Sequence, residues 1–115
     1  MAGLKPLKPS LKEKKRYIIF QVHSEKDIPS KDVLQAIDRA CLEFMGILYY
    51  GKAGVMILKN QYKDNQGIIR VSHKYVDHVK ASLLFIKQIN NIKIKVEPIG
   101  VSGILKKGRE KFMAE

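Results

Sequence analysis

Residues 17–23 read Tyr-Ile-Ile-Phe-Gln-Val-His, a run of β-branched and aromatic residues that predicts a β-strand. A polar turn follows, and Ser30 is then a candidate helix N-cap. Apolar residues next recur at helical spacing, so that one face of the predicted helix is Val33, Leu34, Ile37, Cys41, Phe44 and Met45. Gly46 is placed to end this helix as its C′ residue. A strand followed by an amphipathic helix favours a domain that combines both element types.

The remaining apolar patterns predict three more strands and two more helices. The strands cover residues 54–59, 67–71 and 92–97. The second helix begins near Ser72 and carries a stripe of Tyr75, Val76, Val79, Leu83 and Ile86. A last, basic helix begins at about residue 103. The order β-α-β-β-α-β plus a terminal helix predicts an α+β, ferredoxin-like fold with two helices on one face of an antiparallel sheet. The other face is expected to be open.

The charge is strongly positive and is concentrated at the start of the chain. The 115 residues have 45% hydrophobic content and a formal net charge of +11, as expected of one folded domain with a polyanionic partner. Residues 1–16 hold six basic residues and one acidic residue, together with Pro6 and Pro9. We therefore predict a flexible basic arm over 1–16 and a single domain over 17–115.

The cysteine content and the hydropathy of the chain indicate in which cellular compartment the protein is expected. The one cysteine, Cys41, lies on the apolar stripe of the first helix, so we expect a core thiol and no internal disulfide. The N-terminal residues lack the apolar core of a secretory signal, and no apolar run has the roughly 18 residues that a transmembrane helix needs. We expect a cytoplasmic protein with no membrane partner.

No residue pattern indicates a catalytic or metal site. His23, His73 and His78 lack the spacing of metal ligands, and no phosphate-cradling glycine loop is present. The strand over 67–71 has no aromatic residue on which a base would stack. We therefore expect RNA binding directed at phosphates, through the arm and the last helix. The candidate residues are Lys8, Lys12, Lys14, Lys15, Arg16, Lys106, Lys107, Arg109 and Lys111.

Four apolar residues are candidates for a protein interface. Ile68 is expected on the open face of the sheet together with either Tyr17 and Ile19 or Ile18 and Phe20, and we select Tyr17 and Ile19 as the candidates. Leu84 falls outside the core stripe of its helix. Residues 49–52, Tyr-Tyr-Gly-Lys, form an aromatic and basic cluster that either contacts RNA or a partner or packs over the core, and we favour packing. Gly108 interrupts the apolar stripe of the last helix, which close docking against the sheet would explain.

Four segments together resemble one known family. Residues 8–18, Lys-Pro-Ser-Leu-Lys-Glu-Lys-Lys-Arg-Tyr-Ile, resemble the opening of archaeal ribonuclease P protein component 2. Residues 67–70 resemble its Gly-Ile-Ile-Arg strand, and 75–86 are similar to its second helix. Residues 100–103, Gly-Val-Ser-Gly, resemble its closing element before a basic helix. The order and spacing of all four segments match.

The resemblance implies a role in removing 5′ leaders from precursor tRNA. It implies an RNA-recognition-type fold, and binding to ribonuclease P RNA and to protein component 3 in a two-plus-two heterotetramer. It also implies that the protein contacts precursor tRNA as part of the holoenzyme. Catalysis is then performed by the RNA with Mg²⁺ that the RNA binds, and the protein needs no cofactor. Two alternatives stay open: another small RNA-binding protein of this superfold, such as a ribosome-associated one, or an interaction scaffold that binds no RNA.

Overall fold

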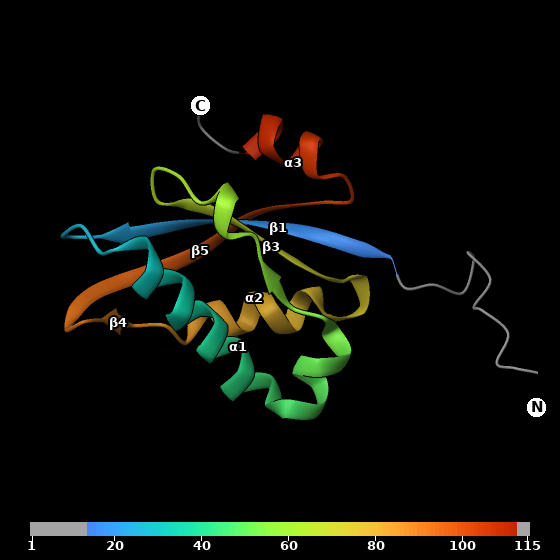
Figure 1. The fold of residues 1–115 in the computed structure, drawn as a ribbon, viewed down its shortest axis with the longest axis horizontal. Helices are drawn as coiled ribbons and strands as arrows, with labels where there is room; N and C mark the ends of the chain where they lie inside the picture. Colours follow the sequence, from blue (N-terminus) through green and yellow to red (C-terminus); the bar gives the residue numbers. More distant parts are fainter. Residues whose placement is uncertain (1–13, 113–115) are drawn as a thin grey trace, which may run out of the picture.

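The central strand of the sheet is the apolar segment with which the domain begins. A computed structural model describes residues 14–112 (Figure 1). In it, β1 (Lys15–Ser24) pairs antiparallel with β3 (Gln66–Ser72) on one side and with β5 (Ile92–Ser102) on the other. Short strands β2 (Met56–Ile57) and β4 (Gln88–Ile89) form the edges, which gives the order β2-β3-β1-β5-β4. This is the predicted α+β fold with one additional edge strand.

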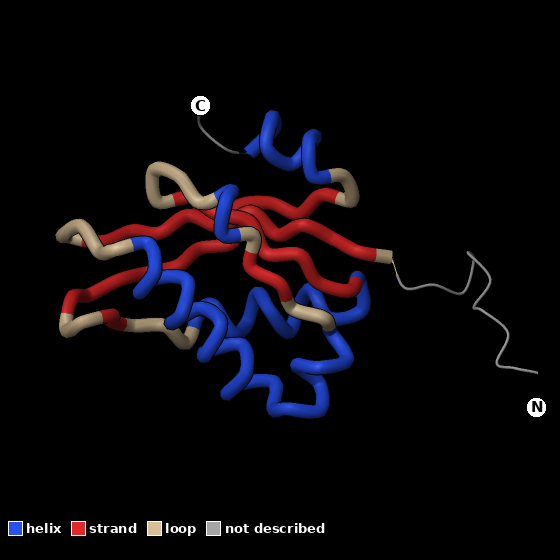
Figure 2. The backbone as a smooth tube through the Cα atoms, viewed as in Figure 1, coloured by secondary structure: helices blue, strands red, loops and turns tan. Residues whose placement is uncertain are grey.

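One face of the sheet carries the main core. Helices α1 (Ser30–Ala53) and α2 (Val76–Leu84) both cover this face (Figures 1 and 2). Alternate residues of β1, Ile18, Phe20 and Val22, point toward them and are buried. The predicted helix stripes supply most of the opposing side chains: Val33, Leu34, Ile37, Cys41, Met45, Val79, Leu83 and Ile86.

The opposite face is only partly open, which corrects the expectation from the sequence. The last helix, α3 (Leu105–Phe112), folds back over it (Figure 1). A Cβ added to Gly108 would lie 3.0 Å from Ile19 Cδ1, so the helix backbone rests directly on β1. Ile19 and its cross-strand partner Ile68 have 0% exposure. The close docking expected of Gly108 is therefore confirmed, and it is the reason that Ile19 is covered.

The first helix differs from the prediction at both ends. Ser30 is its first helical residue, after Pro29, and no side chain caps the helix start by a hydrogen bond. Gly46 has φ 78° and ψ 159°, so regular helix stops there as predicted, but the chain then resumes helical geometry up to Ala53. This second segment turns away from the first (Figure 2). Phe44, two residues before Gly46, is exposed although the stripe predicted it to be buried, and its ring lies against that of Phe85.

Two asparagine-rich turns set the hairpins. Asn90 and Asn91 both have positive φ and join β4 directly to β5, as in a type I′ turn. No strand was predicted before residue 92 in this region, so β4 is an addition to the expected fold. Asp64 and Asn65, also with positive φ, form the turn before β3. Two short 3₁₀ segments, η2 (Lys59–Gln61) and η3 (His73–Tyr75), flank β3.

Candidate nucleic-acid interface

The start of β1 places three basic residues on one end of the sheet. Lys15 and Arg16 were assigned to the arm from the sequence, but they are the first residues of β1. Lys14 precedes them, and its carbonyl accepts a hydrogen bond of 2.8 Å from the backbone N–H of His73. Lys15 Nζ lies 3.3 Å from the position that a Cβ would take on Gly54, at the end of α1. The backbone of these three basic residues is thus held in place by strand pairing and by the hydrogen bond from His73.

Arg16 connects this end of the sheet to the last helix. Its Nη1 donates to the Lys15 carbonyl at 3.0 Å and lies 3.6 Å from the Cβ position of Gly103. Gly103 belongs to the turn into α3, in which the Ser102 hydroxyl donates to the Ile104 carbonyl and accepts from the Ile104 N–H. Because Tyr17 pairs with Ser102 across the strands, the beginning of β1 and the beginning of α3 lie side by side.

Helix α3 presents its basic residues to solvent. Lys106, Lys107, Arg109 and Lys111 are all exposed, whereas Gly108 is buried against the sheet. The helix spans eight residues, or about 12 Å, so the cations form a short row that continues from Arg16. Glu110 is the acidic side chain on the described part of this helix. We call Lys14, Lys15, Arg16 and the basic residues of α3 the basic end.

Seven of the nine predicted RNA-binding residues are therefore described, three at the start of β1 and four on α3. Lys8 and Lys12 lie outside the described residues. Within residues 14–112, Lys14, Lys15, Lys106, Lys107 and Arg109 are in no ion pair, so their charges are not neutralised by neighbouring carboxylates. The arrangement suits a phosphate backbone, which needs rows of cations and little shape complementarity.

The aromatic and basic cluster at 49–52 lies in the last turns of α1 and divides into two parts. The Tyr50 hydroxyl donates a hydrogen bond to Asp38, and its ring packs against the core, as favoured from the sequence. Tyr49 is half exposed, with its ring 6.2 Å from that of Tyr75 and Lys52 Nζ 5.8 Å from its centroid. Only Tyr49 is thus placed to meet a partner.

The four predicted protein-contact residues fall on opposite sides of the sheet. Ile19 and Ile68 are covered by α3 or its surroundings, and Tyr17 is half-buried beside Arg70. Leu84 is exposed at the end of α2. It belongs to a group of exposed apolar side chains on α1 and α2 that meet where the Phe44 and Phe85 rings contact each other at 4.9 Å. This apolar surface consists of Phe44, Ile47, Leu48, Leu84 and Phe85.

Sequence reasoning missed most of this apolar surface. Phe44 fitted the core stripe, and the helix was predicted to end at Gly46, before Ile47 and Leu48. For these last two residues the available signal was Gly46, since apolar residues that follow a helix-breaking glycine no longer share the face of those before it.

The described residues hold no recognisable catalytic centre. No group of three or more His, Cys, Asp or Glu side chains within residues 14–112 is placed to hold a metal ion. Burial, and secondarily the charge of Asp38, raises the pKa of the Cys41 thiol to about 12, so the buried sulfur stays protonated at neutral pH. No helix in this part of the chain is long and apolar enough to cross a membrane.

Comparison with known proteins gives one consistent result. The model of the Rpp14/Pop5 family matches residues 16–113. Ribonuclease P protein component 2 of Methanococcus vannielii is 38% identical over 96% of this chain and 83% of its own length. The protein of the same name from Thermococcus gammatolerans is 37% identical over 96% of this chain and 92% of its own length.

A solved structure supports the fold. A chain in the cryo-EM structure of yeast ribonuclease MRP superposes with a TM-score of 0.62 at 16% identity, covering 79% of this chain and 75% of that one.

Proposed function

The chain belongs to the Rpp14/Pop5 family, and we infer that it is a protein subunit of ribonuclease P. The observation that carries this inference is the similarity along nearly the whole chain to proteins named ribonuclease P protein component 2. We further propose that it binds the catalytic RNA and stabilises its folded form. In this proposal the RNA, with bound Mg²⁺, removes the 5′ leader from precursor tRNA, and the protein contributes no catalytic group. We expect this assembly in the cytoplasm.

The proposed mechanism is charge compensation. A folded catalytic RNA brings phosphates close together, and their mutual repulsion must be reduced by cations. High Mg²⁺ concentrations do this, and so do lysines and arginines held on a rigid scaffold, with release of counterions from the RNA. The basic end supports such a role because its cations are carried on a strand and a helix that are packed against each other through Gly108.

We propose that protein component 3 binds the apolar surface. Phe44, Ile47, Leu48, Leu84 and Phe85 are exposed in the isolated chain, and clustered apolar side chains of this kind are typical of protein contacts. The basic residues of α3 lie on the other side of the sheet, and the remaining residues of the basic end are at the start of β1 (Figure 1). RNA and component 3 would therefore bind at separate surfaces, in an assembly that we expect to contain two copies of each protein.

Reconstituted cleavage tests the function. Precursor tRNA is incubated with the cognate catalytic RNA and component 3 at modest Mg²⁺, with and without this chain. We expect cleavage to depend on the chain, and the variant K14A/K15A/R16A to need more Mg²⁺ for the same rate. The matched control is K31A/K59A/K63A, which removes the same charge from exposed positions near β2.

The outcomes separate the competing functions. If the chain neither changes cleavage nor binds component 3, the ribonuclease P role is refuted and a different RNA target, such as the ribosome, takes its place. RNA binding that is weak and insensitive to salt would instead favour an interaction scaffold, because phosphate contacts make affinity depend on ionic strength.

Binding to component 3 is tested separately. Leu84→Glu should weaken this binding at least tenfold, since it places a charge on the apolar surface, next to Phe85. Ile104→Glu is the control, because Ile104 is similarly exposed but lies at the start of α3 on the other side of the sheet. Equal effects of the two variants would show that component 3 binds elsewhere.

A further inference from the structure

A second group of lysines lies at the end of the sheet opposite to the basic end. Lys87, Lys93 and Lys95, together with His23 and Glu25, line a hollow of about 560 Å³. His23 is near the end of β1, while Lys15 and Arg16 begin the same strand. Because a strand rises about 3.3 Å per residue, this lysine hollow is roughly 25–30 Å from the basic end. None of its residues was selected from the sequence as a binding residue.

Backbone pairing holds the three lysines in place. Lys93 and Lys95 alternate with Ile94 and Val96, which are buried in the core, so both lysine side chains face away from it. Lys87 directly precedes β4, and its carbonyl accepts a hydrogen bond of 3.1 Å from the N–H of Ile94. The cations are therefore carried on a fixed hairpin rather than on a loose loop.

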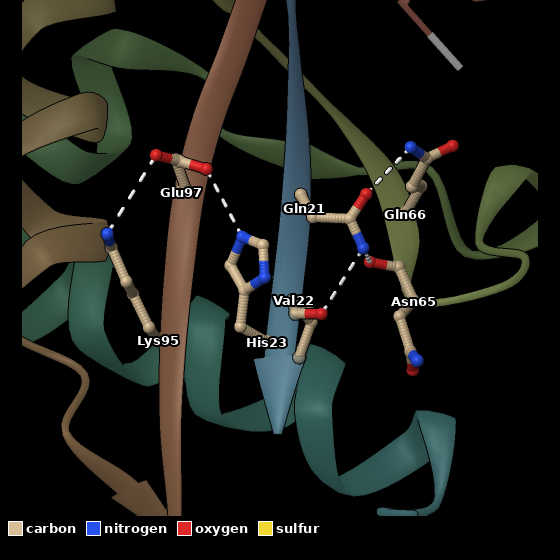
Figure 3. Close-up of polar contacts among 7 residues, drawn as sticks. All are labelled: Gln21, Val22, His23, Asn65, Gln66, Lys95 and Glu97. Carbon is tan, nitrogen blue, oxygen red and sulfur yellow. Dashed lines mark hydrogen bonds and ion pairs between the residues drawn. The ribbon is translucent and has the colours of Figure 1, made fainter. Parts of the chain in front are cut away.

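The neighbouring part of the sheet face is polar and is fixed by hydrogen bonds. Figure 3 shows His23 and Lys95 directed toward Glu97, with His23 Nε2 at 3.2 Å and Lys95 Nζ at 3.9 Å from its two carboxylate oxygens. On the adjoining strand Gln66 Nε2 donates to Gln21 Oε1 at 2.7 Å. In contrast to the area beneath α3, the contacts drawn in Figure 3 are made by polar side chains, and Ile94 is the apolar residue among those that line the hollow.

The charges favour an anionic partner. Three lysines and one carboxylate, Glu25, line the hollow, so its charge is positive. Within residues 14–112, Lys87 and Lys93 are in no ion pair, so both are available to a ligand, while Glu97 is already shared by His23 and Lys95. Fixed cations with few apolar neighbours are typical of contacts to a nucleic-acid backbone, whereas protein interfaces are depleted in lysine.

We propose that the lysine hollow is a second RNA-backbone contact, in which Lys87, Lys93 and Lys95 bind phosphates. One chain then touches RNA at two points on opposite ends of its sheet, and it holds separated parts of the folded RNA at a fixed distance. The identity of that RNA rests on the proposed function, but the existence of the contact does not.

Salt-dependent binding of the full chain to a 20-base-pair RNA duplex tests the contact. K87A/K93A/K95A is compared with the charge-matched control K31A/K59A/K63A. If all three lysines contact phosphates, the slope of log affinity against log salt should become less steep by about 2–3 in the first variant. The control should change it by less than about 1, through its effect on overall charge. Circular dichroism verifies that both variants are folded.

Equal changes of slope in the two variants would overturn the proposal, because only net charge would then matter. An unchanged slope in K87A/K93A/K95A would overturn it as well, and would direct the search to an acidic protein as the occupant. Failure of the chain to support cleavage with component 3 would refute the proposed function while leaving this comparison of slopes valid.

Discussion

Ile18 and Ile19 are neighbours on β1 and are both fully buried, yet they lie on opposite faces of the sheet. Ile18 belongs to the large core beneath α1 and α2. Ile19 is covered by α3, a helix of eight residues that rests on it at Gly108. Two equal degrees of burial therefore have different origins. The first face stabilises the domain, whereas the second positions a basic helix.

The largest loss of stability is expected from Ile18→Ala. Its side chain is surrounded by core residues of two helices, which cannot move together to fill a cavity, so we expect the free energy of unfolding to fall by about 3–5 kcal/mol. Equilibrium unfolding in urea measures this loss. If Ile18→Ala lowered the free energy of unfolding by less than Ile19→Ala does, the face beneath α1 and α2 would not be the one that contributes more to stability.

Ile19→Ala should be less costly, at about 1–3 kcal/mol, because α3 is held from one side and can settle into the space. Its main effect should be local. We expect faster hydrogen exchange in residues 105–111 and little change in α1, as measured by mass spectrometry or NMR. Exchange that accelerates equally in both helices would mean that α3 is part of the main cooperative unit.

Coupling between Ile19 and Gly108 gives a finer test of the same contact. Alanine at position 108 gains about 1 kcal/mol of helix propensity but places a Cβ 3.0 Å from Ile19 Cδ1 and 3.1 Å from Ser102 Cβ. We expect Gly108→Ala to be near neutral alone and to stabilise the Ile19→Ala variant by about 1 kcal/mol. A double-mutant cycle with no coupling would contradict the docking geometry.

The same two faces explain how far the sequence could predict the molecule. Periodicity identified the Ile18 face and its opposing stripes, because a large apolar core imposes regular spacing on both strand and helix. It could not decide whether the Ile19 face was covered, since three apolar residues suit either a partner or a short helix. Gly108 was the informative signal. Among the site residues, the cations of the basic end followed from local charge density.

The lysine hollow did not follow from charge density, for a physical reason. Its cations come from two segments, Lys87 before β4 and Lys93 and Lys95 on β5, and the hairpin turn at Asn90 and Asn91 brings them together. In the sequence these lysines are separated by uncharged residues and do not form a run. Tertiary pairing creates the cluster.

The smallest change in stability is expected from a substitution in the part of the second face that α3 does not cover. Glu97→Gln removes the carboxylate shared by His23 and Lys95, whose side chains are about half exposed or more. Surface ion pairs contribute little, so the free energy of unfolding should change by less than about 1 kcal/mol.

The same change should strengthen RNA binding, because Lys95 and His23 no longer face a nearby negative charge. We expect the affinity for an RNA duplex to rise about two- to fivefold at low salt, the equivalent of about 0.4–1 kcal/mol. Glu43→Gln, an exposed exchange on α1, serves as the control for net charge. A similar gain in that variant would assign the effect to net charge. A gain confined to Glu97→Gln would instead mark the uncovered end of the sheet as a surface kept for binding, since its ion pairs add so little to stability.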